Sequence, residues 1–238
     1  MQRNIGICGS YLREEKGMIL EKRDDYKLNI DLLPEHLRPL AIETQQFLET
    51  RNIYKSAIKE ISTKLEILDD EFSVKYDYNP IHHIESRVKS IQSIFAKMEK
   101  KGLEMTMAGV NALTDIAGIR VICNYKDDVY TIAKLLVGQD DIELIREKDY
   151  IQNPKPSGYR SLHLVVLVPV FLSDSTKRVP VEIQIRTIAM DTWASLEHEL
   201  KYKRKEKLSE KDELQLLRCA EAMAEVDRRM QDIHKELK

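Results

Sequence analysis

The first candidates for chemistry are polar side chains at the start of one predicted strand and on one face of another. Asp115 comes just before a β-branched strand, and Arg120 points to the opposite face from the aliphatic residues of that strand. Glu182 and Gln184 hold polar positions in 181–186, which alternates strictly between aliphatic and polar residues. A carboxylate that faces a cleft can bind a metal ion or act as a base, and a cation on a strand needs a partner. The simpler alternatives are a turn cap for Asp115 and a solvated sheet face for Glu182.

A turn at 155–163 leads into an apolar strand and collects cationic and aromatic side chains. Pro-Ser-Gly at 156–158 is typical of a turn, and Lys155, Tyr159 and His163 surround it. Cations with a tyrosine and a histidine at a strand entry suit an anionic ligand that carries an aromatic base. The alternative is a polar loop whose tyrosine packs against its own stem.

The segment after Pro80 is predicted to form one helix that runs to about residue 101 and ends at Gly102. At about 100° per residue, its lysines cluster opposite an apolar face: Lys89, Lys97 and Lys100 against Ile84, Val88, Ile91, Phe95 and Met98. Arg87 falls inside the apolar arc, so it must extend to solvent, pair with an acid or lie flat on a planar group. An exposed helix end and a solvated lysine face are the alternatives.

The remaining patterns predict the elements that would position these residues. Apolar spacings of three and four predict a long helix over about 39–72, and shorter helices are expected over 129–137 and 189–205. Strands are expected over 119–123, 143–145, 163–168 and 181–186. Ser209 and Asp212 begin a last helix with a heptad of apolar residues: Leu216, Cys219, Met223, Val226, Met230, Ile233 and Leu237. We therefore predict an α+β fold, a mixed β-sheet of about five strands flanked by helices, with long helices at both ends of the chain.

Composition restricts the class of protein. The chain has 238 residues and a net charge of −2, so no overall basic field favours DNA binding, and an anionic ligand needs a local cluster of cations. Its three cysteines are odd in number and far apart, which argues against disulfides and favours the reducing cytoplasm. The longest apolar run, 162–172, is too short to span a membrane, and the N-terminus shows no signal-peptide pattern. Residues 1–17 have no periodicity, so a disordered tail is expected there, with Met18 as an alternative start.

Four motifs, taken in order, resemble the synthetase domain of the RelA/SpoT-type (p)ppGpp synthetases, and most closely the small alarmone synthetases. The similarity covers about 79–202 and rests on Ser-Arg-Val-Lys-Ser at 86–90, Asp-Ile-Ala-Gly-Ile-Arg at 115–120, Ser-Gly-Tyr-Arg-Ser at 157–161 and Val-Glu-Ile-Gln-Ile-Arg-Thr at 181–187. The resemblance implies a nucleotidyltransferase-like synthetase domain over 36–205, after an N-terminal tail over 1–35. Residues 206–238 would form a C-terminal helix for packing or oligomerisation.

The resemblance also implies an activity, the transfer of the β,γ-pyrophosphoryl group of ATP to the 3′-hydroxyl of GDP or GTP with Mg²⁺, which makes the alarmone of the stringent response. Arg87 and Arg120 would sandwich the adenine, which explains two arginines in awkward positions. The implied phosphate ligands are Lys89, Lys97, Lys100 and Lys148. Asp115 and Glu182 would bind the metal ion, and Glu182 would also deprotonate the hydroxyl. The implied acceptor site is Tyr159 stacked on guanine, with Lys155, His163 and Gln184 around the nucleotide.

Further expectations concern hydrolysis, assembly and one unassigned residue. Larger relatives carry a hydrolase domain with a His-Asp metal motif, and no HDxxED string occurs here, so we expect synthesis without hydrolysis. Small synthetases of this family form homotetramers, so the C-terminal heptad is expected to support an oligomer, although packing within the chain is the alternative. Asp191 stands where some relatives have asparagine or histidine, so it receives no role in guanine recognition.

Two competing functions fit parts of the sequence. A polymerase-β-like nucleotidyltransferase would show Gly-Ser followed by Asp-x-Asp, but Gly9 and Ser10 lack that partner, and Asp69 and Asp70 are adjacent. A non-enzymatic RNA-binding module could use the lysine face without needing Glu182, and an RNA contact is also compatible with the synthetase reading. The sequence contains neither a GxxxxGK[ST] phosphate loop nor GxGxxG.

Overall fold

The structure, a computed structural model, describes residues 34–203 and 208–237. The chain divides into two compact units, residues 1–45 and 46–238. The described part of the first unit contains a short 3-10 helix, η3 (Glu35–Leu37), and the beginning of α1 (Arg38–Lys75). The second unit contains the rest of α1 and all later elements, including every residue with predicted chemistry. The predicted tail over 1–35 lies almost entirely outside the described residues.

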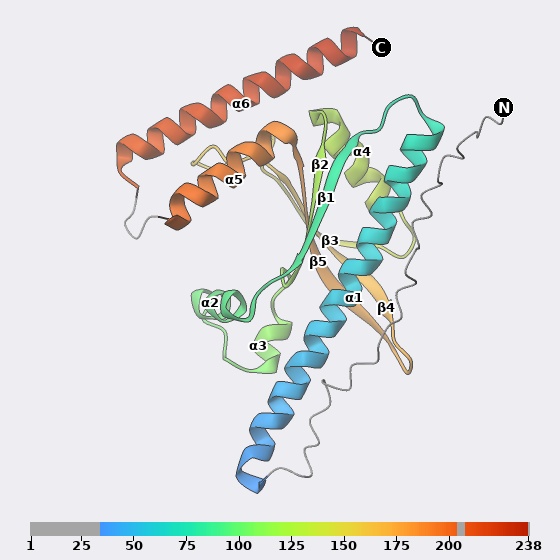
Figure 1. Ribbon diagram of the computed structural model, residues 1–238, viewed down its shortest axis with the longest axis vertical. Helices are drawn as coiled ribbons and strands as arrows, with labels where there is room; N and C mark the ends of the chain where they lie inside the picture. The colour runs from blue at the N-terminus through green and yellow to red at the C-terminus, as the bar shows by residue number, and fades with distance from the viewer. Residues whose placement is uncertain (1–33, 204–207, 238) are drawn as a thin grey trace, which may run out of the picture. The chain divides into compact units, whose positions relative to one another are not determined.

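The second unit is built around a five-stranded mixed sheet (Figure 1). Its strands are β1 (Ile81–Val88), β2 (Ala117–Cys123), β3 (Glu143–Asp149), β4 (Leu162–Phe171) and β5 (Thr176–Thr187). They lie in the order β1-β2-β5-β4-β3, with β2 parallel to β5 and the other neighbouring pairs antiparallel. The prediction of an α+β fold with a mixed sheet of about five strands is confirmed.

One face of the sheet is apolar and carries the core. Because side chains alternate along a strand, β2 and β5 send their aliphatic residues to the same face. Ile119 and Ile183 are fully buried there, in one cluster with Ile61 of α1 and Ile132 of α4 (Lys126–Val137). Burying each side chain of this size contributes about 1.5–3 kcal/mol. The polar residues of the same strands must therefore face the other way.

The prediction of one helix over about 80–101 is wrong for its first half. Ile81–Val88 is strand β1, and helix α2 (Ile91–Lys101) begins only after it. Ile84 and Val88 misled the prediction, because a spacing of four puts two residues on one face of a helix and also on one face of a strand. Pairing with β2 decides in favour of the strand, since it satisfies backbone groups along the length of β1. Arg87 therefore lies on an edge strand and not in the apolar arc of a helix.

Both ends of α2 are capped. The Ser90 hydroxyl accepts a hydrogen bond from the Ser93 amide at 3.3 Å, and Gly102 adopts a left-handed conformation with φ 63°, as predicted for the C-terminal end. Lys89 is consequently not on the same helix as Lys97, as had been predicted, but in the link between β1 and α2. A short helix, α3 (Met107–Asn111), then leads to β2.

Helices α5 (Ile188–Lys203) and α6 (Glu210–Glu236) pack side by side (Figure 1). Trp193 is buried between them and donates its indole N–H to the Leu216 carbonyl at 2.9 Å. The Ser209 hydroxyl accepts from the Asp212 amide, which confirms the predicted start of α6. Of the predicted heptad, Leu216 and Met223 pack in this cluster and Cys219 is exposed. The later heptad residues Val226, Met230 and Ile233 are half-exposed. Within the described ranges, no helix combines the length and the apolar composition that crossing a membrane requires.

Candidate active site

The polar face of the sheet arranges the predicted residues in two rows that cross all its strands. Backbone register sets the first row, from β1 to β3, as Arg87, Gly118, Glu182, Val165 and Arg146. On each strand, the second row lies two residues away from the first, and its members are Glu85, Arg120, Gln184, His163 and Lys148. Side chains at paired positions of neighbouring strands point to the same face. The rows therefore bring residues from three of the four motifs together with His163, which follows the remaining motif by two residues.

These rows form the floor of a cleft that also receives side chains from α2 and from the turns around the sheet. All the predicted site residues except Lys100 line it: Arg87, Lys89, Lys97, Asp115, Arg120, Lys148, Lys155, Tyr159, His163, Glu182 and Gln184. Lys101, one turn after Lys97 on α2, takes the lining position that had been predicted for Lys100. Cations far outnumber carboxylates in this lining, so the cleft suits a polyanionic ligand.

Asp115 lies just before β2 and anchors two lysines from neighbouring elements. Its Oδ2 atom lies 2.5 Å from Lys89 Nζ and 2.7 Å from Lys97 Nζ. Burial alone would raise the pKa of Asp115, but the hydrogen bonds and charges of the two ammonium groups outweigh burial and lower the pKa below its ordinary value. Asp115 is therefore ionised at neutral pH and holds both lysines at one end of the cleft.

The second carboxylate oxygen of Asp115 fits a metal ion. Among the described residues, none donates a hydrogen bond to its buried Oδ1 atom. A buried anionic oxygen without a donor is costly unless a cation reaches it. Glu182 lies close enough for the charge of Asp115 to act on its pKa. One or two carboxylates, completed by substrate phosphates and water, are the ligands that Mg²⁺ usually takes, so Asp115 and Glu182 fit a magnesium ion.

Glu182 lies in the middle of the polar face, on β5. Its Oε2 atom accepts a hydrogen bond from Gln184 Nε2 at 3.1 Å, and its Oε1 atom lies 3.6 Å from His163 Nδ1. Burial raises the pKa of Glu182, but His163 and Gln184 together lower it more, so the pKa lies below its ordinary value. Glu182 is thus a carboxylate at neutral pH, available to a metal ion or to a hydroxyl proton.

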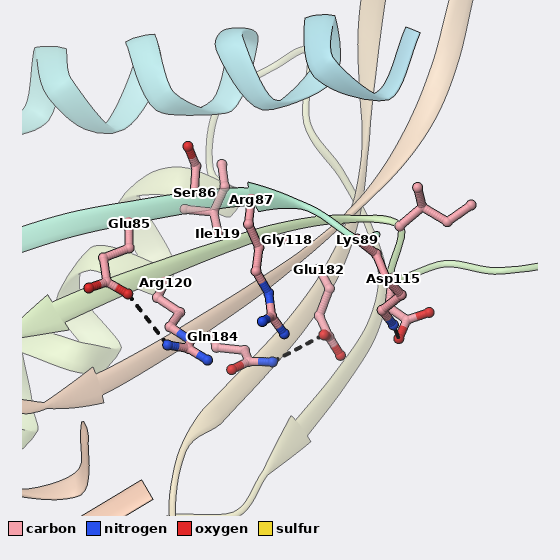
Figure 2. A pocket seen from close by; sticks show the side chains of 11 residues that line it. Glu85, Ser86, Arg87, Lys89, Asp115, Gly118, Ile119, Arg120, Glu182 and Gln184 are labelled. Atoms are coloured by element: carbon pink, nitrogen blue, oxygen red, sulfur yellow. Dashed lines mark hydrogen bonds and ion pairs between the residues drawn. The ribbon is translucent and has the colours of Figure 1, made fainter. Parts of the chain in front are cut away.

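Arg87 and Arg120 border a pocket at the β1–β2 edge of the cleft, where both project to the same side of the sheet as Glu182 (Figure 2). Gly118 pairs with Arg87 across the strands and precedes Arg120 by two residues, so the sheet has no side chain between them. A Cβ at Gly118 would meet only the Arg87 carbonyl oxygen, at 3.8 Å, so this floor is open. Glu85 holds Arg120 at 3.4 Å. Two guanidinium groups beside an open floor suit a planar base.

The turn before β4 supplies the other end of the cleft. Gly158 has φ 88° and its N–H donates to the Lys155 carbonyl at 2.8 Å, a closed turn that only glycine adopts readily. The Lys155 ammonium lies 4.5 Å from the ring centroid of Tyr159 and 4.6 Å from that of Tyr150. The Tyr159 hydroxyl lies 2.8 Å from His163 Nε2. An aromatic ring with a nearby ammonium group suits a stacked base with phosphates attached.

Arg146, Tyr150 and Arg186 are among the residues that line the cleft without having been predicted as site residues. Arg146 could have been found from Lys148, because residues two apart on a strand share a face. No local pattern signals Tyr150, since its contact with Lys155 crosses a turn. The strict alternation of 181–186 also puts Arg186 on the polar face of its strand, but it does not predict the burial of this side chain, because arginine is almost never fully buried unless paired.

Comparisons with known proteins relate the chain to one family of nucleotide-using enzymes. The family model described as a region found in RelA / SpoT proteins matches residues 86–207. GTP pyrophosphokinase YwaC of Bacillus subtilis (strain 168) is 40% identical over 209 residues, covering 87% of this chain and 100% of the relative. GTP pyrophosphokinase YjbM of the same strain is 38% identical over 184 residues, covering 77% and 86%. Among solved structures, small alarmone synthetase 1 from Bacillus subtilis bound to its product pppGpp matches with a TM-score of 0.77 at 36% identity, covering 82% of this chain and 99% of that chain.

A cation-lined cleft with two carboxylates is suited to binding nucleotide phosphates and to phosphoryl transfer. The chain belongs to the RelA/SpoT family. The resemblance to small alarmone synthetases is confirmed by both sequence and structure.

Proposed function

We propose that this chain is a GTP pyrophosphokinase, which transfers the β,γ-pyrophosphoryl group of ATP to the 3′-hydroxyl of GDP or GTP and makes (p)ppGpp. The observation that carries the proposal is the place of Glu182, which the register puts between the open floor at Gly118 and the His163 end of the cleft. A donor nucleotide on one side and an acceptor on the other would meet at this carboxylate. The named activities of YwaC and YjbM support the proposal.

ATP binds on the β1–β2 side. The adenine lies over Gly118, between the guanidinium groups of Arg87 and Arg120, because this pocket is flat, open and bordered by both. The phosphates extend toward Asp115, where cations line the cleft: Lys89, Lys97 and Lys101, with Lys148 on the far strand. Lys101 replaces Lys100 in this assignment because Lys101 is the one that lines the cleft.

GDP or GTP binds on the β4 side. Its guanine stacks on Tyr159, next to the ammonium group of Lys155, which is placed to attract the phosphates. His163 and Gln184 flank Glu182 and border the ribose. The attacking 3′-hydroxyl then lies within reach of the Glu182 carboxylate.

Asp115 and Glu182 would hold Mg²⁺ together with the ATP phosphates. The buried Asp115 Oδ1 atom, which accepts no hydrogen bond from any described residue, supports this assignment. When bound, the ion neutralises phosphate charge and acidifies the attacking hydroxyl. Glu182 accepts the hydroxyl proton while the ribose oxygen attacks the β-phosphorus in line. The bond from that phosphorus to the α–β bridging oxygen breaks, and AMP leaves with the oxygen.

The lowered pKa of Glu182 bears on how much it contributes as a base. Proton transfer is most effective when the pKa of the base is near the working pH, and the pKa of Glu182 is well below that. Positioning and electrostatic stabilisation must therefore supply most of the rate, as in other phosphoryl transfers. The lysines held by Asp115 are placed to stabilise the charge that spreads over the transferred group.

We also propose a homo-oligomer, a tetramer, in the cytoplasm. The half-exposed apolar residues of α6, Val226, Met230 and Ile233, support it as a stripe that a second copy would cover. The two described cysteines, Cys123 and Cys219, are both unpaired, which supports a reducing compartment. Light scattering at micromolar concentration should give a tetrameric mass, and a monomeric mass would contradict the proposed assembly.

The activity is tested by incubating the protein with ATP, Mg²⁺ and either GDP or GTP and separating the nucleotides by ion-exchange chromatography. The wild type should produce AMP and a guanosine carrying two additional phosphates in equal amounts. Glu182→Gln should lower kcat by about 10²–10⁴-fold. The matched control Glu143→Gln should not, because Glu143 is an exposed residue that pairs with Arg178. Retention of full activity in Glu182→Gln would rule out the assigned mechanism.

A further inference from the structure

Arg186 is a buried cation beside the site that substrate binding does not explain. Its side chain is at the end of β5, and the residue is only 4% exposed. Nη1 donates to Asp191 Oδ1 at 3.0 Å, which compensates its charge. Nη2 donates both to the Tyr159 hydroxyl at 2.6 Å and to Gln184 Oε1 at 2.8 Å. One terminal nitrogen thus contacts two residues of the acceptor site.

Two arms lead from this nitrogen to the two oxygens of Glu182. In the first arm, Gln184 accepts from Arg186 through Oε1 and donates through Nε2 to Glu182 Oε2 at 3.1 Å. In the second, the Tyr159 hydroxyl lies 2.8 Å from His163 Nε2, and His163 Nδ1 lies 3.6 Å from Glu182 Oε1. Arg186 and Glu182 therefore close a ring of polar contacts through Gln184 on one side and Tyr159 and His163 on the other.

Arginine sets the direction of every proton in this ring. The guanidinium group stays protonated and has no acceptor, so each partner must accept from it. Because the Tyr159 oxygen accepts from Arg186, its own proton is free to point toward His163 Nε2. A neutral His163 whose Nε2 accepts carries its proton on Nδ1, the nitrogen that faces Glu182. In the other arm, Gln184 turns its oxygen to Arg186 and must present its amide N–H to Glu182.

We propose that Arg186 is a positioning residue for the transfer reaction: it sets the tautomer of His163 and the amide orientation of Gln184, and so directs one donor at each oxygen of Glu182. This rests on the proposed function, in which Glu182 faces the acceptor hydroxyl. It gives the Tyr159 hydroxyl a task separate from the stacking of its ring. Without the cation, the hydrogen bonds around this closed set of contacts can reverse their direction. His163 then presents the lone pair of an unprotonated Nδ1 to the Glu182 carboxylate. Second-sphere contacts of this kind are typically worth about 10–100-fold in activity.

Kinetics of three variants test the proposal. Arg186→Lys keeps the charge but loses the planar fork, and Tyr159→Phe keeps the stacking ring and the buried cation but breaks one arm. Both should lower kcat by about 10–100-fold while the KM values for ATP and the guanine nucleotide change little. Arg178→Lys is the matched control on the same strand, because Arg178 is exposed and pairs with Glu143, and it should keep the wild-type kcat. If Arg186→Lys does not fold, as its thermal unfolding will show, Tyr159→Phe carries the test.

A spectroscopic readout tests the tautomer without any turnover. The ¹⁵N shifts of a histidine ring distinguish a protonated from an unprotonated nitrogen, and the His163 signal can be assigned from its loss in His163→Gln. At pH 8 the wild type should carry the proton on Nδ1, and Tyr159→Phe should show a population with the proton on Nε2. If the wild type makes no (p)ppGpp, the proposed function fails, whereas a proton on Nε2 in the wild type or an unchanged kcat in both variants overturns the role of Arg186.

Discussion

Replacing Asp115 by asparagine removes the anchor of the two lysines and keeps the size of the side chain. Asp115 and Lys89 are 11% and 16% exposed at their side chains, so their contact is better protected from water than a surface ion pair. Lys97 is 37% exposed and contributes less. Hydrogen bonds to charged groups contribute about 1.5–3 kcal/mol each. We therefore expect Asp115→Asn to lower the free energy of unfolding by about 2–4 kcal/mol.

Thermal unfolding of the ligand-free protein measures this loss. In a domain of this size, about 1 kcal/mol corresponds to about 2–4 °C in Tm, so the variant should unfold about 5–15 °C lower at pH 7. The matched control is Asp141→Asn, which removes a half-exposed carboxylate 2.8 Å from Lys64. Asp141 is 45% exposed, so water screens this pair more than the Asp115 pair. Exposed pairs are worth about 0–1 kcal/mol, so the control should unfold within a few degrees of the wild type.

The pH dependence gives a second, independent check. The pKa of Asp115 is lowered in the folded state, so the unfolded chain binds this proton at a higher pH than the folded chain does. The stabilisation is therefore fully present above the unfolded pKa of about 3.9 and is lost as pH falls through the lower folded pKa. The difference in Tm between wild type and Asp115→Asn should be constant down to about pH 5 and shrink below about pH 4. Equal Tm values at pH 7, or a difference that does not shrink in acid, would refute the assigned anchor.

Three further changes test the donor site, the acceptor turn and the assembly. Gly118→Val fills the open floor between the arginines, so steady-state kinetics should show a higher KM for ATP with an unchanged Tm. An unchanged KM would show that the adenine does not bind in this pocket. Gly158→Ala must place a Cβ 2.5 Å from the Ala220 Cβ at a φ of 88°. The free energy of unfolding should therefore fall by about 1–3 kcal/mol, and Tm should fall with it. A Tm equal to that of the wild type would contradict the turn geometry. Met230→Glu charges the half-exposed stripe of α6, and light scattering should show a smaller assembly than the wild type; an unchanged mass would place the interface elsewhere.

Strong local patterns predicted the centre of the fold. The alternation in 181–186 and the β-branched run at 119–123 are found in β5 and β2, and they correctly placed Glu182 and Gln184 on the face opposite the core. Strand β1 could not be predicted in the same way, because its apolar residues fit a helix equally well and only pairing with β2 selects the strand. Only the structure therefore shows that Arg87 lies on an edge strand. An arginine among apolar residues had nevertheless already marked it as a candidate binding residue.

Contacts within the site depend on strand order, which local patterns do not contain. His163 approaches Glu182 because β4 lies beside β5, and Lys89 and Lys97 meet at Asp115 because the β1–α2 segment lies against the start of β2. The links from Arg186 to both arms of the ring are equally non-local. A single sequence therefore indicates which residue types are unusual, and the topology decides which of them meet.

The central claim is that a pyrophosphoryl group moves intact from ATP to a guanine nucleotide at Glu182. The most direct measurement is ³¹P NMR of the complete reaction with ATP, GDP and Mg²⁺. We predict new signals from a diphosphate on the 3′-oxygen of the guanosine ribose, with AMP appearing in equal amount. Free pyrophosphate would indicate nucleotidyl transfer, and an unchanged spectrum would indicate a binding protein. Either result would contradict the account.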